Sequence, residues 1–353
     1  MPSLKPLSEQ VIVITGASSG IGLATALMAA ERGAKVVLSA RSRDALAEAV
    51  DRIKQAGGDA AFAVADVGRK EDLEAVAAAA VERFGGFDTW INNAGVGIWG
   101  TIDEVSEPDM RQLFETNFWG VVHGSEVAVK HLRAKGGALI NIGSVTSDRA
   151  FPVQGFYSAS KHAVKGFTVA LRMELEHERA PVSVTLIKPA SIGTPMPQHV
   201  KNYSDKEPNF PPPVYAPEEV AATILRAAEH PVRDAYIGGG ARTIATLSRT
   251  APALLDWISA KFLVPAQYGD KPASPGDNLY RGKAEAEVRG DHQGSVIRPS
   301  LYTRAARHPG ATLTAAGVAA AGVGAFLWSR RGRAEGTAQA ETSEEREVEA
   351  HPS

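Results

Sequence analysis

The stretch VIVITGASSGIG, residues 11–22, joins a short apolar run to a glycine-rich turn and then to a helical pattern. The run 11–14 is continuous and β-branched, as in a strand buried on both faces of a sheet. Glycines in the turn let the backbone pass close to a pyrophosphate, and the N-terminus of the next helix offers unpaired amides. The turn lies between a strand and a helix, which is the context that dinucleotide binding requires.

The same alternation of apolar runs and helical stretches continues to about residue 240. Such a pattern predicts a parallel sheet covered by helices on both faces. The expected strands are 11–14, 35–39, 61–64, 89–91, 138–142, 182–187 and 235–237. The expected helices are 22–32, 44–55, 70–84, 107–132, 158–178 and 218–229. We predict an α/β fold with a Rossmann-like, doubly wound parallel sheet, formed as a single domain over residues 8–240.

A helical C-terminal extension follows this domain. Residues 241–264 supply amphipathic helices that are too short to bury a core alone, and we interpret them as a lid or packing element. Residues 265–308 are rich in proline, glycine and charge, which indicates a linker or a surface loop. An apolar helix is expected over 309–330, and a disordered tail over 331–353.

The run 311–328 within this extension is uncharged and 18 residues long. That length is at the low edge of the roughly 17 to 25 residues that span a bilayer. Its content is mostly alanine and glycine, so two interpretations stay open: a membrane anchor, or an alanine-rich helix that packs on the body or projects freely. Arginines on both flanks leave the orientation undecided.

Composition excludes several classes of protein. With 44% hydrophobic and 22% charged residues, the chain of 353 residues is typical of a folded soluble protein. A net charge of −2 gives no reason to expect a nucleic-acid partner. The chain has no cysteine, and its nine histidines form no ligand cluster, so we predict no metal site. No secretory signal is visible, and the expected location is cytoplasmic, with membrane association through the C-terminal helix left open.

The end of the second strand bears on the choice of cofactor. An acid at that point accepts hydrogen bonds from the two ribose hydroxyls, whereas an arginine pairs with a 2′-phosphate. Here the strand 35–39 is followed by Ala40 and Arg41. The sequence therefore favours NADP(H), and NAD(H) remains the alternative.

Three side chains have the chemistry of proton transfer. Tyr157 and Lys161 are four residues apart in a helical segment, so phenol and ammonium share one face. A nearby cation stabilises a phenolate and lowers the tyrosine pKa. Ser144 follows the strand 138–142 at the carboxyl edge, where open α/β sheets bind ligands, and its hydroxyl can hydrogen-bond a substrate oxygen.

These residues resemble the short-chain dehydrogenase/reductase family. Residues 15–22 fit its TGxxxGxG pattern, Asp66 and Val67 resemble its adenine-contacting element, and residues 92–95 match its NNAG segment. Asn117, Ser144, Tyr157 and Lys161 match its Asn-Ser-Tyr-Lys set, with 13 residues between the serine and the tyrosine. The resemblance covers about residues 10–240.

The resemblance implies a role for each matching residue. Tyr157 is the general acid in reduction and the general base in oxidation, and Lys161 lowers its pKa and holds the nicotinamide ribose. Ser144 positions the carbonyl, and Asn117 anchors a water in the proton relay. The implied cofactor contacts are Gly16, Ser18, Ser19, Gly20, Ile21, Gly22, Arg41, Asp66, Val67, Asn93, Ala94, Gly95, Tyr157, Lys161, Pro189, Ile192 and Thr194.

Two positions depart from the family pattern. Pro189 is followed by Ala190 where relatives have glycine, so the loop near the nicotinamide is expected to differ slightly. Many NADP-preferring relatives carry a basic residue inside the glycine turn, where this chain has Ser19, and this weakens the NADP prediction without reversing it.

Substrate contacts in this family come from loops after the fourth, fifth and sixth strands. Those loops offer a mainly apolar lining here, which indicates a lipophilic aldehyde, ketone or alcohol. Ser144, Val145, Gln154 and Tyr157 are the expected substrate contacts, with Val96, Ile98, Trp99, Phe151, Phe156, Met196 and residues 197–214 as further candidates.

The sequence predicts an enzyme that interconverts a carbonyl and a primary or secondary alcohol. The alternative from another class is a catalytically idle NADP(H)-binding scaffold or redox sensor at a membrane. The complete set of Asn117, Ser144, Tyr157 and Lys161 argues against that alternative, because cofactor binding alone does not need it. An epimerase or dehydratase also uses tyrosine and lysine, but usually with another glycine pattern and a larger C-terminal domain. By analogy with the family we expect a homo-oligomer formed through 107–132 and 158–178.

Overall fold

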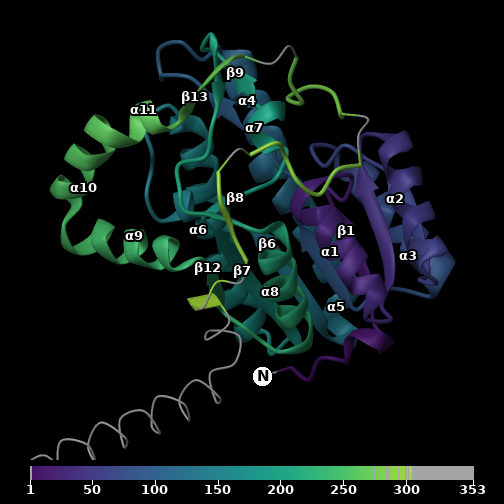
Figure 1. The fold of residues 1–353 in the computed structure, drawn as a ribbon. Coiled ribbons are helices and arrows are strands. Elements are labelled where there is room, and N and C mark those ends of the chain that lie inside the picture. Colours follow the sequence, from purple (N-terminus) through teal and green to yellow (C-terminus); the bar gives the residue numbers. More distant parts are fainter. Residues whose placement is uncertain are drawn as a thin grey trace, which may run out of the picture. The chain divides into compact units, whose positions relative to one another are not determined.

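Seven parallel strands form one sheet in this computed structural model, which describes residues 2–303 apart from 274–275, 284–285, 293, 299 and 301. The order across the sheet is β12-β7-β6-β4-β1-β2-β3 (Figure 1). The strands are β1 (Val11–Thr15), β2 (Lys35–Ala40), β3 (Ala60–Val64), β4 (Thr89–Asn92), β6 (Gly137–Ile142), β7 (Val182–Pro189) and β12 (Asp234–Ile237). Strand order reverses between β1 and β4, because the chain builds outward from β1 in both directions.

Alternate residues of β1 belong to two separate hydrophobic clusters. Ile12 and Ile14 pack with α1 (Gly20–Glu31), α2 (Arg43–Gln55) and α8 (Pro217–Glu229) on one face. Val11 and Val13 pack on the other face with α3 (Lys70–Phe84), α5 (Gly120–Lys135) and α6 (Gly155–His177). Because successive side chains of a strand point to opposite faces, a strand buried on both sides must be apolar throughout. The predicted doubly wound α/β fold is confirmed.

The helix expected over 107–132 is interrupted, and that expectation was wrong in part. Helix α4 (Glu107–Phe114) passes into a π-helical segment, Glu115–Trp119, before α5 begins at Gly120. A π-helical turn inside an α-helix is a common feature of functional sites, since it re-aims one side chain. Asn117 lies in the middle of this segment and is buried.

Short strands and helices surround the carboxyl edge of the sheet. The strand pairs are β5 (Ile98–Trp99) with β9 (Lys201–Asn202), β10 (Lys206–Pro208) with β13 (Tyr268–Pro272), and β11 (Val214–Tyr215) with both β8 (Ser191–Ile192) and β14 (Val296–Ile297). The helices are α7 (Met196–His199), α9 (Gly239–Thr250), α10 (Pro252–Ile258) and α11 (Val264–Ala266), with a π-helical segment at Ser259–Leu263. Residues far apart in the sequence thus meet above the sheet.

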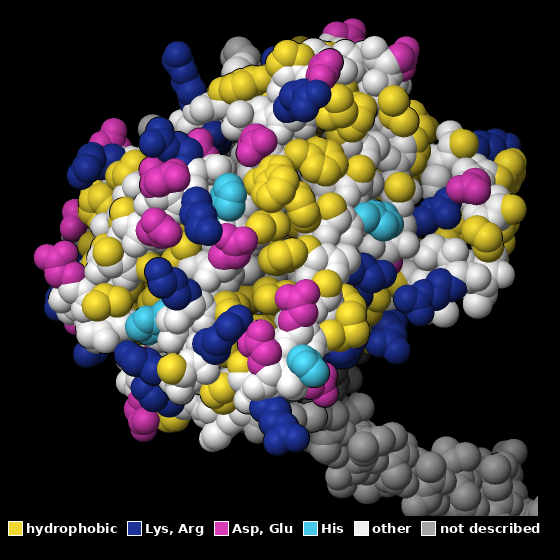
Figure 2. Space-filling view, turned by 180° about the vertical axis from the view of Figure 1, so that it is seen from behind, with side chains coloured by type: hydrophobic (Ala, Val, Ile, Leu, Met, Phe, Trp, Pro, Cys, Tyr) yellow, Lys and Arg dark blue, Asp and Glu magenta, His cyan; other side chains and the backbone are white. Residues whose placement is uncertain are grey.

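Figure 2 views the molecule from behind, and acidic and basic side chains are interspersed over that face. No helix among the described residues is long and apolar enough to cross a bilayer. The apolar run 311–328 and the tail 331–353 lie outside the described residues.

Candidate active site

Hydrogen bonds join the end of β1 and the glycine turn to the segment after β4. The Thr15 hydroxyl accepts hydrogen bonds from the amides of Asn93 (3.1 Å) and Ala94 (3.2 Å). The Asn93 side chain in turn donates to the carbonyl oxygens of Thr15 and Gly16 at 3.0 and 3.1 Å. These bonds bring the ends of two sheet neighbours together at the point where the strand order reverses.

Two glycines of the turn are sterically required. Gly16 has φ of +64°, and a Cβ there would lie 2.6 Å from the Cα of Ala94. At Gly22 a Cβ would lie 2.2 Å from the Gly16 carbonyl oxygen. Gly22 therefore serves the packing of the turn against α1, and it does not line the hollow above it.

That hollow extends along the carboxyl edge of the sheet. It is lined by the predicted contacts Gly16, Ser18, Ser19, Gly20, Ile21, Arg41, Asp66, Val67, Asn93, Ala94, Gly95 and Thr194. A second cavity adjoins it, and the two share the lining residues Ile21, Asn93, Gly95, Thr194 and Met196. An elongated crevice that starts at a glycine turn and a helix N-terminus fits an extended dinucleotide.

Ser144, Tyr157 and Lys161 line the second cavity. Ser144 lies beyond β6 and caps a short 3₁₀ turn, with its hydroxyl accepting a hydrogen bond from the Thr146 amide at 3.1 Å. Tyr157 and Lys161 come from the first two turns of α6. The Lys161 ammonium donates to the Ile142 carbonyl oxygen at 2.9 Å and lies 5.8 Å from the centre of the Tyr157 ring. The structure thus brings together three of the four predicted catalytic side chains.

Asn117, the fourth, is fully buried beneath the cavity. Its amide oxygen accepts from the Val96 amide at 2.8 Å, and its nitrogen donates to the Val96 carbonyl at 2.9 Å. The same nitrogen donates to the Ser160 hydroxyl at 3.2 Å, one residue before Lys161. Asn117 therefore joins the loop after β4 to α6.

Burial sets the protonation of the Tyr157 and Lys161 pair. It raises the pKa of Tyr157 to about 12, and the hydrogen bond with Ser144 works against this rise. It also lowers the pKa of Lys161 to about 8. The direction at Tyr157 is opposite to the lowering expected from a neighbouring cation, because desolvation penalises the phenolate more than its neighbours stabilise it.

The cavity beside this pair has a mainly apolar wall. The predicted contacts Val145 and Gln154 line it, as do Trp99, Phe151, Met196 and Phe210 from the candidate loops, and Pro189 and Ile192 from the expected cofactor set. Ile98 and Phe156 instead belong to a hydrophobic cluster, and Val96 faces the neighbouring hollow. Ala190 has no positive φ, since Val153 and Arg179 are the non-glycine residues with positive φ in the described part of the chain.

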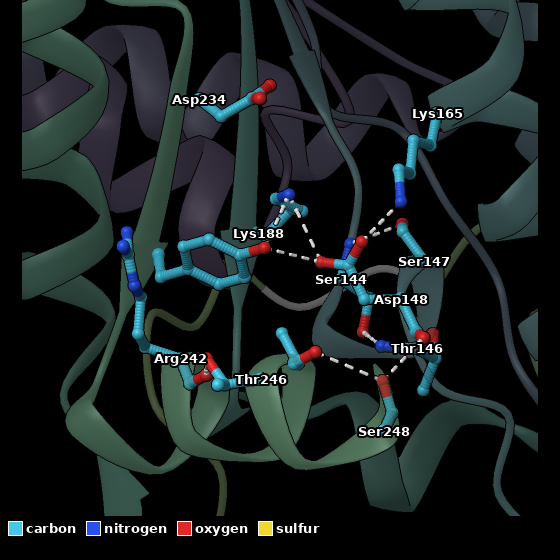
Figure 3. A network of polar contacts seen from close by, with 12 residues as sticks. Ser144, Thr146, Ser147, Asp148, Lys165, Lys188, Asp234, Arg242, Thr246 and Ser248 are labelled. Carbon is cyan, nitrogen blue, oxygen red and sulfur yellow. Dashed lines mark hydrogen bonds and ion pairs between the residues drawn. The ribbon is translucent and has the colours of Figure 1, made fainter. Parts of the chain in front are cut away.

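A buried polar network supports the Ser144 turn from behind. Asp148 lies four residues after Ser144, and its carboxylate contacts Lys165 at 2.5 Å and Lys188 at 3.1 Å (Figure 3). The Tyr236 hydroxyl donates to Asp148 at 2.7 Å and accepts from Lys188 at 2.8 Å. Asp148 thus connects the turn to α6, β7 and β12.

Helix α9 adds a contact to this network. The Ser248 hydroxyl donates to the backbone carbonyl oxygen of Asp148 at 3.4 Å, and α9 lies along the turn in Figure 3. Burial by itself would raise the pKa of Asp148, but hydrogen bonds from Lys165, Tyr236 and Lys188 outweigh it and lower the pKa below its ordinary value.

Sequence reasoning missed the residues that the C-terminal part contributes. Asn278, Gly282 and Lys283 line the first hollow, and Leu263 and Gln267 line the second. Gln267 is fully buried and hydrogen-bonds Gln154, a predicted substrate contact. These residues belong to no local motif, so nothing in the sequence near them indicates a site.

Comparisons with known proteins identify the family of the chain. The family model described as short chain dehydrogenase matches residues 10–205. The uncharacterized oxidoreductase YxnA of Bacillus subtilis is 48% identical over 311 residues, which is 87% of each chain. The 3beta-hydroxysteroid dehydrogenase of Mediterraneibacter gnavus is 36% identical over 189 residues, which is 53% of this chain and 68% of its own.

Two solved structures share the fold. A short chain dehydrogenase/reductase from Burkholderia phymatum in complex with NAD has a TM-score of 0.64 and 28% identity, and the match covers 71% of this chain and 97% of that one. An alcohol dehydrogenase from Thermococcus sibiricus complexed with 5-hydroxy-NADP has a TM-score of 0.57 and 27% identity, and that match covers 65% and 94%.

The fold and the crevice therefore define an α/β oxidoreductase of the class that binds a nicotinamide dinucleotide. Within that class, the chain belongs to the short chain dehydrogenase family.

Proposed function

We propose that this protein is an NADP(H)-preferring oxidoreductase that interconverts a lipophilic carbonyl compound and its alcohol. The observation that carries the proposal is the convergence of Ser144, Tyr157 and Lys161 on one apolar cavity, which is continuous with the hollow above the glycine turn. Cofactor binding alone does not need the complete set of Ser144, Tyr157 and Lys161.

Each side chain has a task that follows from its position. A bound nicotinamide would supply or accept the hydride. In reduction, the Tyr157 hydroxyl donates its proton to the carbonyl oxygen as the carbon gains the hydride, and oxidation reverses both transfers. The Ser144 hydroxyl hydrogen-bonds that oxygen and holds it beside Tyr157.

The pKa values set the protonation states from which carbonyl reduction would start. A tyrosine with a pKa of about 12 is protonated at neutral pH and is ready to act as an acid. Lys161, with a pKa of about 8, is largely cationic at neutral pH and can stabilise the phenolate that remains. Asn117 acts through the backbone of Val96 and the Ser160 hydroxyl, and we assign it the positioning of this relay.

The cofactor preference rests on the end of β2. Ala40 and Arg41 lie there and both line the hollow, with no carboxylate in the place where an acid would bind ribose hydroxyls. Burial lowers the pKa of Arg41 and the nearby Asp66 carboxylate opposes this, so the guanidinium stays charged at neutral pH. A cation suits a 2′-phosphate better than two hydroxyl groups.

The apolar cavity wall supports the substrate class. Trp99, Phe151 and Phe210 can cover a hydrocarbon body, while Ser144 and Tyr157 meet a single oxygen. The name of the Mediterraneibacter gnavus relative, which refers to a hydroxysteroid, is consistent with such a substrate.

The first prediction concerns Tyr157→Phe. We expect carbonyl reduction by NADPH to fall by at least about 100-fold, because general acid catalysis contributes roughly that much. The NADPH dissociation constant should change little, since the ring remains. The rate of reduction is measured from nicotinamide absorbance with a panel of lipophilic and polar carbonyl compounds. The dissociation constant is measured by titrating the purified protein with NADPH.

Ser144→Ala is the companion variant, with reduced turnover and retained cofactor binding as the expected result. If Tyr157→Phe turned over substrate at the rate of the unchanged protein, the assigned mechanism would be wrong. If NADPH bound but neither the unchanged protein nor Tyr157→Phe reacted with any compound, a catalytically idle NADP(H)-binding scaffold would be the better interpretation.

A further inference from the structure

A segment of the C-terminal part lies across the mouth of the hollow. We call it the C-terminal strap and define it as residues 276–283 and 286–292. In Figure 1 its trace passes from the end beside α4 toward α2 and returns to β8. Asn278, Gly282 and Lys283 of the strap line the hollow together with the glycine turn and Arg41. The strap therefore forms one wall of the crevice assigned above to the dinucleotide.

Backbone contacts hold the strap at this place. The Arg41 guanidinium donates from Nη1 to the Leu279 carbonyl at 3.1 Å and from Nη2 to the Asn278 carbonyl at 2.5 Å. The Gly20 amide, in the glycine turn, donates to the Glu287 carbonyl at 2.8 Å. The strap thus touches the end of β2, expected to bind the adenosine ribose, and the glycine turn, expected to bind the pyrophosphate.

Buried side chains anchor the same segment. Leu279 is fully buried in the cluster that contains Val96 and Leu113. The Tyr280 hydroxyl donates to the Asp109 carboxylate on α4 at 2.7 Å. A loop held by a buried leucine and a buried acceptor presents its neighbouring side chains in a defined place.

Lys283 lies in the strap and lines the same hollow as Arg41. Gly282 approaches so closely that a Cβ there would lie 3.2 Å from the Arg41 Cβ and 3.1 Å from the Ser42 amide nitrogen. The next residue, Lys283, has no ion pair or hydrogen bond with any other residue in the described part of the chain. Arg41 uses two of its five N–H groups on the strap, which leaves three for a ligand.

Two cations at one end of a dinucleotide crevice match a group with two negative charges. The pyrophosphate belongs at the glycine turn and the helix N-terminus, so it does not account for cations at the end of β2. A 2′-phosphate on the adenosine ribose carries close to two negative charges and projects toward the end of the second strand. A ribose without this phosphate would offer these two cations hydroxyl groups and no negative charge.

We infer that Lys283 of the C-terminal strap, together with Arg41, forms the subsite for the 2′-phosphate of NADP(H). This inference rests on the proposed function and assigns its cofactor selectivity to a residue 242 positions from Arg41 in the chain. The strap thereby supplies the basic side chain that the glycine turn lacks at Ser19.

Binding of nucleotide fragments tests the subsite without turnover. The probes are adenosine 2′,5′-bisphosphate and adenosine 5′-monophosphate, titrated calorimetrically into the full-length protein. We expect Lys283→Ala to weaken bisphosphate binding by about 10-fold and monophosphate binding by less than about twofold, because a charged hydrogen bond to a phosphate is lost. Lys283→Arg should restore most of the bisphosphate affinity.

Arg281→Ala is the matched control. Arg281 carries the same charge on the same strap, but it is exposed and does not line the hollow, so bisphosphate binding should change by less than about twofold. Thermal unfolding of each variant checks that the strap and the body remain folded.

Several results would overturn the subsite. Unchanged bisphosphate affinity in Lys283→Ala would show that Lys283 is not part of the subsite. An equal loss of affinity for the bisphosphate and the monophosphate would show a general effect on the crevice. Tighter binding in Lys283→Ala would mean that the strap obstructs the cofactor. If the unchanged protein bound NADPH and NADH equally and still reduced carbonyl compounds, the inference would fail while the oxidoreductase assignment stood.

Discussion

The glycine turn has no room for a Cβ atom at Gly16 or Gly22. At Gly16 the backbone takes a left-handed conformation, and at Gly22 a hydrogen in place of a methyl group permits contact with the Gly16 carbonyl oxygen. The motif therefore encodes close packing as well as access for a ligand. This is why the spacing of its glycines could be interpreted from the sequence alone.

Gly22→Ala tests this packing. The added Cβ would lie 2.2 Å from a backbone oxygen and 2.6 Å from the Asn93 side chain, so the turn must move. We expect a loss of about 3 kcal/mol in the free energy of unfolding, together with loss of nucleotide binding. Chemical denaturation and NADPH titration measure the two effects.

Gly166→Ala is the control substitution. Gly166 lies inside α6, and a Cβ there would meet nothing within 4 Å. Its replacement should stabilise the protein by about 0.5–1 kcal/mol through helix propensity. If Gly22→Ala behaved like Gly166→Ala, the steric explanation of the motif would be wrong.

The turn after β6 is the element on which the site depends most. It carries Ser144 at its start and Asp148 at its end, and the Asp148 carboxylate is tied to two lysines and a tyrosine from three other elements. The side chains of Asp148 and Lys188 are 5% and 4% exposed. Such a pair is costly to break, because the remaining charge is left buried.

Asp148→Ala should therefore lower the free energy of unfolding by about 3–5 kcal/mol, since it leaves the Lys188 ammonium unpaired. An exposed pair provides the comparison: Asp59 contacts Arg83 at 2.9 Å, and these side chains are 41% and 54% exposed. Asp59→Ala should cost less than about 1 kcal/mol. Equal effects in urea denaturation would show that the network contributes no special stability.

The same network predicts a dependence on pH. The folded pKa of Asp148 is below its ordinary value of 3.8, so the folded state binds this proton less tightly than the unfolded state. The stabilisation is therefore complete above about pH 5 and is lost as the pH falls through 4 and below. We expect the stability difference between the unchanged protein and Asp148→Asn to be constant from pH 7 to 5 and to shrink below pH 4. A difference that grew on acidification would contradict this sign.

At the scale of the whole molecule, the C-terminal strap makes the crevice depend on residues distant in the chain. Leu279 is fully buried against Val96 and Leu113, although it lies in a stretch that reads as a polar loop. If the strap folds with the body, it should unfold with it in one transition.

Leu279→Ala tests this coupling. We expect a loss of about 3 kcal/mol in the free energy of unfolding, as for other buried leucines. Leu254→Ala is the control, because Leu254 on α10 is 56% exposed, and it should cost less than about 1 kcal/mol. Unchanged stability of Leu279→Ala in urea denaturation would show that the strap folds independently of the body.

Two expectations about the whole molecule stay predictions. Trp119 and Met173 are exposed on the helical segments expected to join subunits, and sedimentation of the purified protein will show whether they do so. A membrane anchor is one of the two interpretations left open for 311–328, and this run lies outside the described residues.

Local sequence patterns predicted the doubly wound sheet, the glycine turn and the set of Ser144, Tyr157 and Lys161. These features follow from local periodicity and from spacings within one strand, turn or helix, where the backbone geometry is known in advance. Local patterns did not predict the π-helical turn at Asn117 or the raised pKa of Tyr157, because both depend on what packs around the residue.

The positions of the strap and of Lys283 follow from contacts between distant parts of the chain. The contacts that hold them join residues more than 200 positions apart, from Arg41 to Asn278 and Leu279 and from Gly20 to Glu287. Most of these contacts use backbone carbonyl oxygens, which every residue possesses. Because a backbone acceptor leaves no trace in residue type, no pattern along the chain can reveal it.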